Sequence, residues 1–359
     1  MTDSRDERGK RHELAFVILL FSWALLRSTG KLSLSFIHRT MFHFHNEIAN
    51  ECGSSSKRCI SRPQLSRVLN SFDYKSFNDF SKDLCCSSFE DVWYALDGKE
   101  LRGSIDGVAG EKRGENIVLK VGHTTKKSTV IGYYSGKKES EKTSIKNFFK
   151  DCENLKDQKY TLDALHNSEQ LLSDIHQKSG TYLVQIKNNQ KILLEDLKDI
   201  SMFSTPFQIH TTEEKGHGRI EERKYEAYSI DPTDICHKWK CSGIQTLIKV
   251  NRQTTQLKNQ RETKEISYYV TNQNSDIEEL SNAIRGHWSV ETNNYIRDTN
   301  FGEDGFKSFK IKIQRSVSAI LTFIMNVVNA LEMEGNTNEK RENLAYSKET
   351  AKFALKNVL

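Results

Sequence analysis

Three acidic residues stand in settings where carboxylates could do chemistry. Asp97 follows the apolar run VWYAL and precedes a Gly-Lys pair, so we expect a strand to end there and display the acid. Asp163 follows a second short apolar stretch, and Glu291 lies in a segment with helical character. Hard cations such as Mg²⁺ take oxygen ligands and keep positions open for phosphate and water. The hypothesis is that Asp97, Asp163 and Glu291 hold two Mg²⁺ or Mn²⁺ ions.

Such a constellation suits phosphodiester chemistry. A site that cleaves an anionic phosphodiester must neutralise charge, activate a water or a 3′-hydroxyl, and stabilise an in-line displacement. Two metal ions about 3.5 to 4 Å apart can do all three. For any single Asp or Glu, a solvated residue at the end of a strand or on a helix is the more common explanation. The three acids together favour the metal site.

The elements that must position these acids follow in a recognisable order. Residues 92–97, 116–124 and 128–136 predict three strands, the last two joined as a hairpin through Lys126 and Lys127. Then come a helix (141–152), a fourth strand (159–165), a helix (167–180), a fifth strand (181–187) and a helix (190–200). This α/β order is that of the ribonuclease-H-like fold, in which Asp97 and Asp163 would lie side by side.

The chain is predicted to hold three parts. Residues 1–88 indicate an N-terminal helical domain, in which Ser61 is the candidate N-cap of a helix with Pro63 in its first turn. A helix-turn-helix with Arg62 and Arg67 facing DNA is one interpretation of that domain, and plain helical packing is the other. Residues 89–335 predict the ribonuclease-H-like catalytic domain, with a β-rich insertion at about 204–274. Residues 336–359 are a polar tail with weak helical character.

Composition limits the setting. The apolar run at 14–26 is shorter than the about 20 residues that span a bilayer, so we expect a buried helix, and we expect a core helix at 317–331. The seven cysteines include no CxxC pair, which fits a reduced cytoplasm without a disulfide or zinc framework. A formal charge of +5, from 53 Lys and Arg against 48 Asp and Glu, suits contact with phosphates, although an ordinary solvated surface fits as well.

Four ordered stretches resemble the DDE transposases of bacterial insertion sequences, in the branch of the H-repeat-associated proteins (the ISAs type). They are ALDGKELRGS, the run from TLDALHN through YLVQIKNNQ, KGHGRIEERKYEAY and RGHWSVETNNYIRDTNFGED, and the resemblance covers about residues 91–331. It implies that Asp97, Asp163 and Glu291 are the metal-binding triad. It also implies hydrolysis at transposon ends, transfer of the 3′-hydroxyl into target DNA, and a cytoplasmic homo-oligomer assembled on the terminal inverted repeats and associated with the nucleoid.

Basic residues near these motifs are the candidates for contact with DNA phosphates. They are Lys99, Arg102, Lys187, His217, Arg219, Arg223, Arg285 and His287. Each could equally be a surface cation, and those at 217–223 could form a cross-strand charge ladder.

The segment around Glu291 departs from the wider superfamily. Relatives often carry Arg four residues before the Glu and Lys seven after it, whereas this chain has His287 and Asp298. On a continuous helix, His287, Glu291 and Asp298 would share one face. Asp298, Glu303 and Asp304 are rival acids, and Trp288 is expected in the core. Two other functions use the same features: a ribonuclease-H-like nuclease without strand transfer, and a non-catalytic DNA-binding relic of a transposase.

Overall fold

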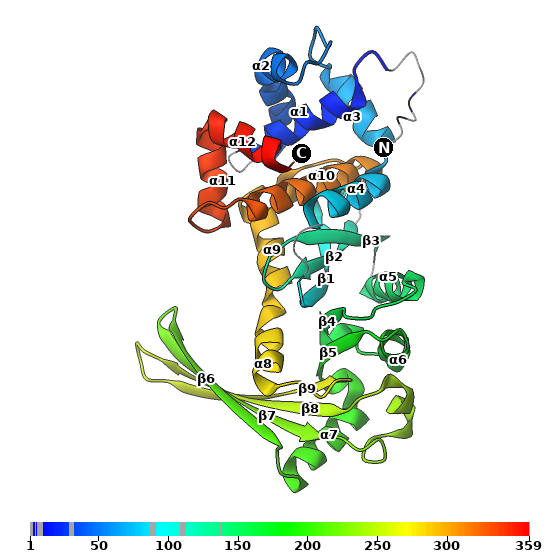
Figure 1. Cartoon of the computed structure of the whole chain (residues 1–359), viewed down its shortest axis with the longest axis vertical. Coiled ribbons are helices and arrows are strands. Elements are labelled where there is room, and N and C mark those ends of the chain that lie inside the picture. Colours follow the sequence, from blue (N-terminus) through cyan, green and yellow to red (C-terminus); the bar gives the residue numbers. More distant parts are fainter. Residues whose placement is uncertain are drawn as a thin grey trace. The chain divides into compact units, whose positions relative to one another are not determined.

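The computed structural model describes residues 3, 5, 10–28, 32–86, 91–107, 113–136 and 138–358, and within them it shows a mixed α/β fold of twelve α-helices and one nine-stranded sheet (Figure 1). Hydrogen bonds link the strands in the order β3-β2-β1-β4-β5-β9-β8-β7-β6. The chain divides into two compact units. The first comprises Met1–Asp91, Gly98–Glu141 and Ser289–Leu359, and the second Val92–Asp97 and Lys142–Trp288. The three-part division expected from the sequence stays a prediction.

The core of the first unit is helical. Its helices are α1 (Leu14–Leu26), α2 (Leu34–Glu51), α3 (Arg62–Ser71), α4 (Tyr74–Cys86), α9 (Trp288–Thr299), α10 (Ile311–Ala330), α11 (Thr337–Tyr346) and α12 (Lys348–Val358). The first residue of α9, Trp288, belongs to the second unit. Helix α10 is long and apolar enough to cross a membrane by length and composition, but most of it is buried inside the protein. Helix α1 is buried on nearly every face. Both apolar runs are therefore core helices, as expected.

Local signals explain several helix ends, and two expectations need revision. Ser33 caps α2 by accepting the Phe36 N–H at 3.1 Å. Ser61 precedes α3 as predicted, but its hydroxyl donates to the Gln64 side chain instead of capping the backbone. The sequence also predicts a capping box of Ser275 with Glu278. This prediction is wrong, because α8 (Ile277–Gly286) begins after Asp276 and has no side-chain cap. The polar tail forms α11 and α12, which the weak helical pattern had indicated only in part.

The second unit is built on strands. Strands β4 (Lys159–Leu162) and β5 (Thr181–Ile186) are parallel to each other and to the first part of β1, and α6 (Glu169–Gln177) connects β4 to β5. After α7 (Lys191–Phe203) the chain forms four antiparallel strands: β6 (Gln208–Gly216), β7 (Arg219–Ser229), β8 (Thr246–Gln256) and β9 (Glu262–Thr271). These four strands account for the strand pattern predicted between 204 and 274.

Strand β1 (Trp93–Leu101) is longer than the sequence predicts. We expected it to end at Asp97, but the strand continues through Gly98 to Leu101, and Asp97 lies inside it. The continuation is stable because Lys99 and Leu101 are buried alternately, the lysine with carboxylates around its ammonium. Strand β1 thus belongs partly to each unit. The first unit also contains β2 (Glu115–Gly122) and β3 (Ser128–Ser135), which form the predicted hairpin joined through Lys126 and Lys127.

A close backbone approach in the first unit requires glycine at position 103. Gly103 lies in the short turn after β1, and its carbonyl accepts the Ser308 N–H at 3.1 Å. A Cβ at Gly103 would overlap the carbonyl oxygen of Phe306. Because this oxygen belongs to the backbone, only backbone movement could relieve the clash. The segment after α9 is therefore held against the end of β1.

We expect Gly103→Ala to lower the free energy of unfolding by roughly 1 to 3 kcal/mol, because the added methyl group overpacks this contact. Gly107→Ala is the matched control: a Cβ there meets no atom of the described residues within 4 Å, so the change should stay within about 0.5 kcal/mol. Urea unfolding measures both, and equal effects of the two substitutions would contradict the packing explanation.

Candidate active site

Two of the three predicted acids lie at adjacent positions in the second unit. Strands β1 and β4 pair in parallel, and their last hydrogen-bonded pair is Leu96 with Leu162. Asp97 is the next residue of β1, Asp163 directly follows the end of β4, and both are half-buried. Neighbouring strands lie about 4.7 to 4.9 Å apart, so the two carboxylates share one edge of the parallel strands. The register therefore brings two carboxylate side chains to the same edge of the parallel strands.

The surroundings of Asp163 keep its carboxylate charged. Burial raises its pKa, but the ammonium of Lys187, the N–H of Ala164 and the ring of His287 act in the opposite direction, and the net pKa lies below its ordinary value. The Lys187 Nζ is 3.5 Å from Oδ1, and the Ala164 N–H donates to the same oxygen at 2.7 Å. The Asp163 carboxylate is therefore ionised at neutral pH, and its oxygens can bind a cation.

His287 lies at the junction of two helices, since α8 ends at Gly286 and α9 begins at Trp288. The continuous helix that would put His287 and Glu291 on one face is therefore interrupted at His287. The His287 Nδ1 is 3.0 Å from the hydroxyl of Thr161 on β4. Burial lowers the pKa of His287 to about 4, so the ring is neutral at neutral pH. A neutral ring favours a hydrogen-bonding role over the cationic phosphate contact that we expected.

Glu291 belongs to the other unit. It is an exposed residue in the first turn of α9. Within the described ranges, no three His, Cys, Asp or Glu side chains are arranged to hold a metal ion. The structure thus brings together Asp97 and Asp163, and the assignment of Glu291 stays a prediction. Trp288 was expected in the core and is instead 61% exposed.

The donor chemistry of the acid pair fits a hard cation. Asp97 and Asp163 offer carboxylate oxygens at one edge of the parallel strands, and Asp163 is held ionised. Mg²⁺ and Mn²⁺ prefer such oxygen ligands and are commonly held by one or two carboxylates while phosphate and water complete their coordination.

The rival acids of the first unit surround a buried lysine. Lys99 is 5% exposed, and its Nζ lies 2.6 Å from Asp298, 3.2 Å from Asp304 and 3.8 Å from Glu303. A buried ammonium needs such partners, because desolvation of an unpaired charge costs several kcal/mol. These contacts assign the three acids a structural role. They also commit Lys99 to carboxylates, which does not favour the phosphate contact we expected of it.

Arg297 is a structural residue that the sequence reasoning missed. It is fully buried in α9, and its guanidinium donates two hydrogen bonds to Glu303, at 2.7 and 2.8 Å, and others to Ser318 and Thr322 of α10. Its spacing could have revealed it, because Arg297 lies four residues after Asn293 and seven after Val290, on the buried face of α9.

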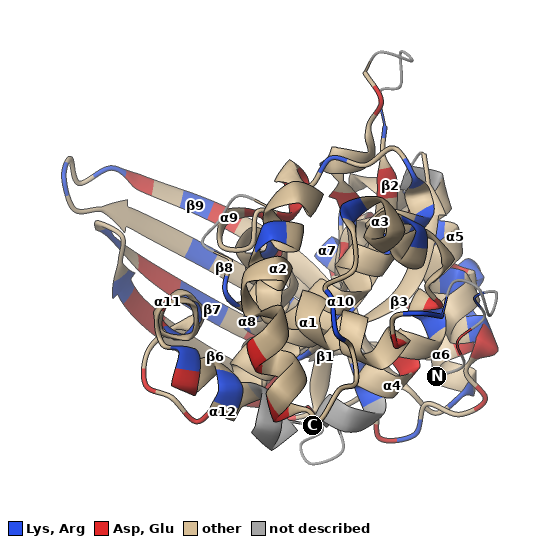
Figure 2. Ribbon diagram, turned by 90° about the horizontal axis from the view of Figure 1, so that it is seen from above, with Lys and Arg blue, Asp and Glu red and all other residues tan. Residues whose placement is uncertain are grey.

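The remaining predicted phosphate contacts differ in exposure. Arg102 and Lys187 have exposed side chains, 72% and 55% respectively. In the antiparallel strands, Arg223 is buried and paired with Glu221 and Glu214, and Arg285 of α8 is paired with Glu214. Figure 2 shows basic and acidic segments next to each other along these strands. For Arg223 the structure shows the cross-strand charge ladder that we held as the alternative, and Arg285 joins this ladder through Glu214.

His217 and Arg219 lie at the far end of the same strands. His217 is exposed in the turn between β6 and β7, and Arg219 is 52% exposed and 2.8 Å from Glu221. Their position is compatible with an external partner.

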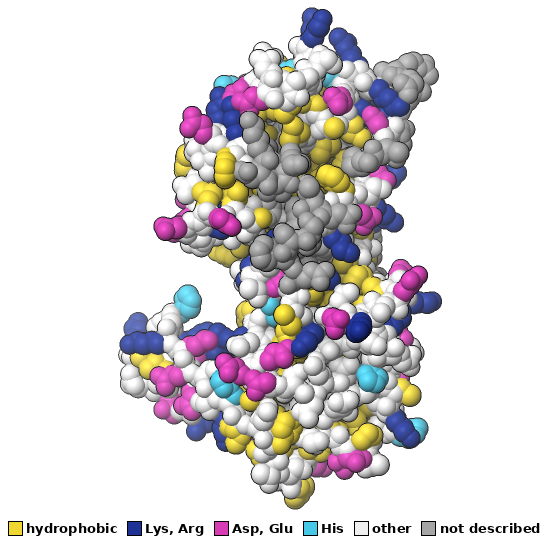
Figure 3. Space-filling model, in the orientation of Figure 1, with side chains coloured by type: hydrophobic (Ala, Val, Ile, Leu, Met, Phe, Trp, Pro, Cys, Tyr) yellow, Lys and Arg dark blue, Asp and Glu magenta, His cyan; other side chains and the backbone are white. Residues whose placement is uncertain are grey.

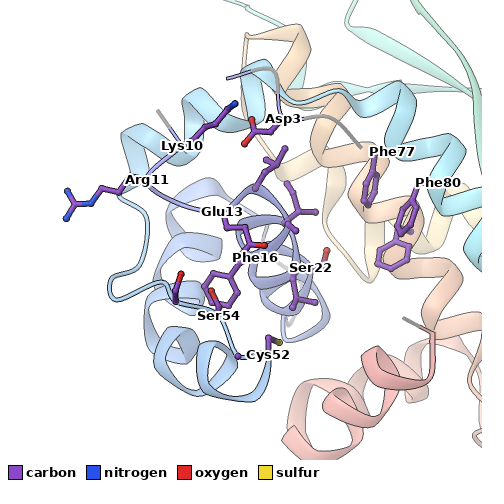
Figure 4. Close-up of a pocket in the computed structure, with 17 residues that line it drawn as sticks. Asp3, Lys10, Arg11, Glu13, Phe16, Ser22, Cys52, Ser54, Phe77 and Phe80 are labelled. Carbon is purple, nitrogen blue, oxygen red and sulfur yellow. The ribbon is translucent and has the colours of Figure 1, made fainter. Parts of the chain in front are cut away.

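A cavity of about 900 Å³ lies in the helical part of the first unit (Figure 4). Its wall includes Phe16 and neighbouring apolar residues of α1, Phe77 and Phe80 of α4, and Phe323 of α10, and Arg11 at its edge points away. It contains none of the predicted site residues.

Two proteins of similar sequence are both described as "Putative transposase YncI". The chain is 24% identical to the one from Escherichia coli O157:H7 over 292 residues, which are 78% of this chain and 74% of that protein. It is 27% identical to the one from Escherichia coli strain K12 over 177 residues, or 47% of this chain and 69% of that protein. No protein-family model matches the chain. The chain is thus similar, at moderate identity, to two proteins that carry this name.

We expect Lys99→Met to lower the free energy of unfolding by about 3 to 5 kcal/mol, because it leaves the carboxylates around Lys99 without their cation. Arg102→Met removes an exposed cation from the same segment and should change the stability by less than about 0.5 kcal/mol. Urea unfolding compares them. If Lys99→Met left stability unchanged and weakened DNA binding, the phosphate contact would be right after all.

We also expect a specific acid dependence from Glu303. Burial raises its pKa, but Arg297, Lys99 and Ser318 more than offset this, and the folded-state pKa is below its ordinary value. A depressed carboxyl pKa stabilises the fold above the unfolded pKa of about 4.3, and this stabilisation is lost as the pH falls through the folded pKa. Glu303→Gln should therefore lower stability at pH 7 and show a smaller further loss between pH 5 and pH 3 than the unchanged protein. Parallel pH curves from urea unfolding would contradict this.

Proposed function

We propose that this chain is a DNA transposase of the DDE type, which hydrolyses phosphodiesters at transposon ends and joins the freed 3′-hydroxyl to target DNA. The observation that carries the proposal is the register that places Asp97 beside Asp163 at one edge of parallel strands. The two similar proteins named as transposases support the same class.

The strand arrangement supports a ribonuclease-H-like core. Strands β2 and β3 are antiparallel, β1, β4 and β5 are parallel, and the order β3-β2-β1-β4-β5 is the one expected for that fold. Helix α5 (Lys138–Asp151) connects β3 to β4, and α6 connects β4 to β5. Crossover helices between parallel strands follow the usual α/β rule. In this proposal the strands β6 to β9 are an insertion in the core.

The residues of the proposed site have distinct roles. Mg²⁺ or Mn²⁺ ions, when bound, would lower the pKa of the attacking water or hydroxyl and stabilise the leaving oxygen. Asp97 and Asp163 would hold them, and Glu291 is proposed as the third ligand. Lys187 keeps Asp163 ionised, and its exposed ammonium is available to a DNA phosphate. His287 positions Thr161 on β4, two residues before Asp163.

The partners follow from this activity. The substrates would be the terminal inverted repeats of a mobile element and its target DNA, and joining two ends requires more than one copy of the chain. A cytoplasmic location at the nucleoid is part of the same proposal. The nuclease without strand transfer and the inactive DNA-binding relic remain alternatives that one experiment separates.

The test is cleavage of a supercoiled plasmid that carries the flanking inverted repeats, with Mg²⁺ or Mn²⁺. We expect cuts at the repeat ends and joined products. Loss of a residue that only supports a metal ligand by a hydrogen bond costs about 10- to 100-fold in activity. Asp97→Asn and Asp163→Asn remove a proposed ligand itself, so each should reduce cleavage by more than that. Asp199→Asn, on the exposed face of α7, is the matched control and should cleave normally.

Each other outcome selects a different function. Cuts without joined products would indicate the nuclease, and binding of the repeats without cleavage would indicate the relic. Because the Glu291 side chain is exposed, Glu291→Gln should leave folding unchanged and abolish cleavage. Normal cleavage by Glu291→Gln would remove Glu291 from the proposed triad.

A further inference from the structure

The antiparallel strands of the second unit end in two neighbouring turns. Strands β6 to β9 form an arm that extends past α8 (Figure 1). At one end of this arm, residues 217–218 connect β6 to β7 and residues 257–261 connect β8 to β9. Together with the strand residues next to these turns, they make up the segments 215–219 and 256–261. We call these two segments the arm tip.

The two turns form one surface because they are bonded to each other. Arg219 pairs with Gln256 at the end of the β7–β8 ladder, and the Leu257 N–H donates to the Gly218 carbonyl oxygen at 2.8 Å. His217, Gly218 and Gln260 have positive φ angles of 49°, 74° and 54°, so both turns are tight. The side chains of both turns are therefore presented together.

The arm tip is basic, and the nearest acids in its strands, Glu214 and Glu262, border its two segments. All four charged residues in its two segments are basic: Lys215, Arg219, Lys258 and Arg261, with His217 beside them. All five are exposed. Figure 3 shows Lys, Arg and His side chains at the free end of the arm. A local charge of four positive groups is large beside the +5 of the whole chain.

These cations differ from those of the rest of the arm. Arg223, Lys224 and Arg252 are each paired with a glutamate. At the tip, Arg219 contacts Glu221, whereas Lys215, Lys258 and Arg261 make no ion pair within the described part of the chain. Exposed cations without carboxylates keep their full charge for an external anion.

We propose that the arm tip binds the phosphate backbone of duplex DNA. Repeated phosphates match a group of long basic side chains, and release of their counterions drives such binding. The large apolar anchors that dominate protein interfaces are missing from the tip segments, where Leu257 is the one apolar residue. The proposal rests on the proposed function for its choice of DNA. It adds Lys258 and Arg261, which lie outside the sequence motifs, and Lys215, which begins one motif but was not among the predicted contacts. Arg223 stays in the ladder.

The test compares two double substitutions that remove the same charge. Lys258→Gln with Arg261→Gln alters the tip, and Lys198→Gln with Lys240→Gln alters exposed lysines on α7 and in the turn between β7 and β8 at the other end of the arm. Fluorescence anisotropy would measure binding of a duplex carrying the inverted repeat, with EDTA present, at several salt concentrations between 50 and 200 mM.

We expect the tip substitutions to weaken DNA binding at least about 10-fold at low salt. The slope of log K against log salt should decrease in magnitude by roughly 2, about one for each lost phosphate contact. The control pair should bind as the unchanged protein does. An unchanged slope for the tip variant, or an equal loss in both variants, would overturn the proposal. So would an equal affinity and an equal loss with an RNA duplex.

Binding in EDTA separates this proposal from the proposed transposase activity. If the unchanged protein cleaves the plasmid but the tip variant binds DNA normally, the arm-tip contact is wrong and the transposase stands. If the tip variant loses binding and the unchanged protein never cleaves, the contact stands and the catalytic function is wrong. Circular dichroism of both variants checks that the fold is intact.

Discussion

Strands β1 and β4 pair in parallel from Trp93 opposite Lys159 to Leu96 opposite Leu162, and the chemistry of the second unit depends on this register. Leu96 and Leu162 are buried, which holds the two strands in place. A slip of one residue would turn every side chain of one strand to the opposite face, so Asp97 and Asp163 would no longer lie on the same side of the sheet. Hydrophobic burial of the neighbouring leucines therefore positions the acids.

Desolvation decides which charged residues remain available for function. Lys99 and Arg297 are buried, so the fold must supply carboxylates to them, and Asp298, Glu303 and Asp304 meet that need. An acid-rich motif can thus arise from structural requirements alone. Asp163 is different, because its partner Lys187 is exposed and can exchange the carboxylate for another anion.

Local patterns predicted the elements well, and tertiary contacts decided the rest. The apolar runs fixed α1, α10 and the early strands, and the order of those strands predicted that Asp97 would meet Asp163. The sequence could not show that β1 continues past Asp97, because the continuation depends on acids about 200 residues away that neutralise Lys99. It also misplaced Trp288, since an aromatic residue after a glycine-containing helix end gives no sign of which side faces solvent. The break in the helix at His287 has the same origin.

The arm illustrates why a net charge says little about where a protein meets DNA. Along β6 and β7 a ladder runs from Arg285 through Glu214 and Arg223 to Glu221 and Arg219. The Arg285–Glu214 pair is exposed and contributes at most about 1 kcal/mol, whereas Arg223 and Glu221 are buried. All of these pairs favour one register and cancel each other's field at a distance. Beyond Glu221 the acids of this ladder stop while the cations continue into the turns. A partner that senses charge over a Debye length, about 8 Å at physiological salt, would therefore meet the uncompensated charge of the tip and little of the ladder.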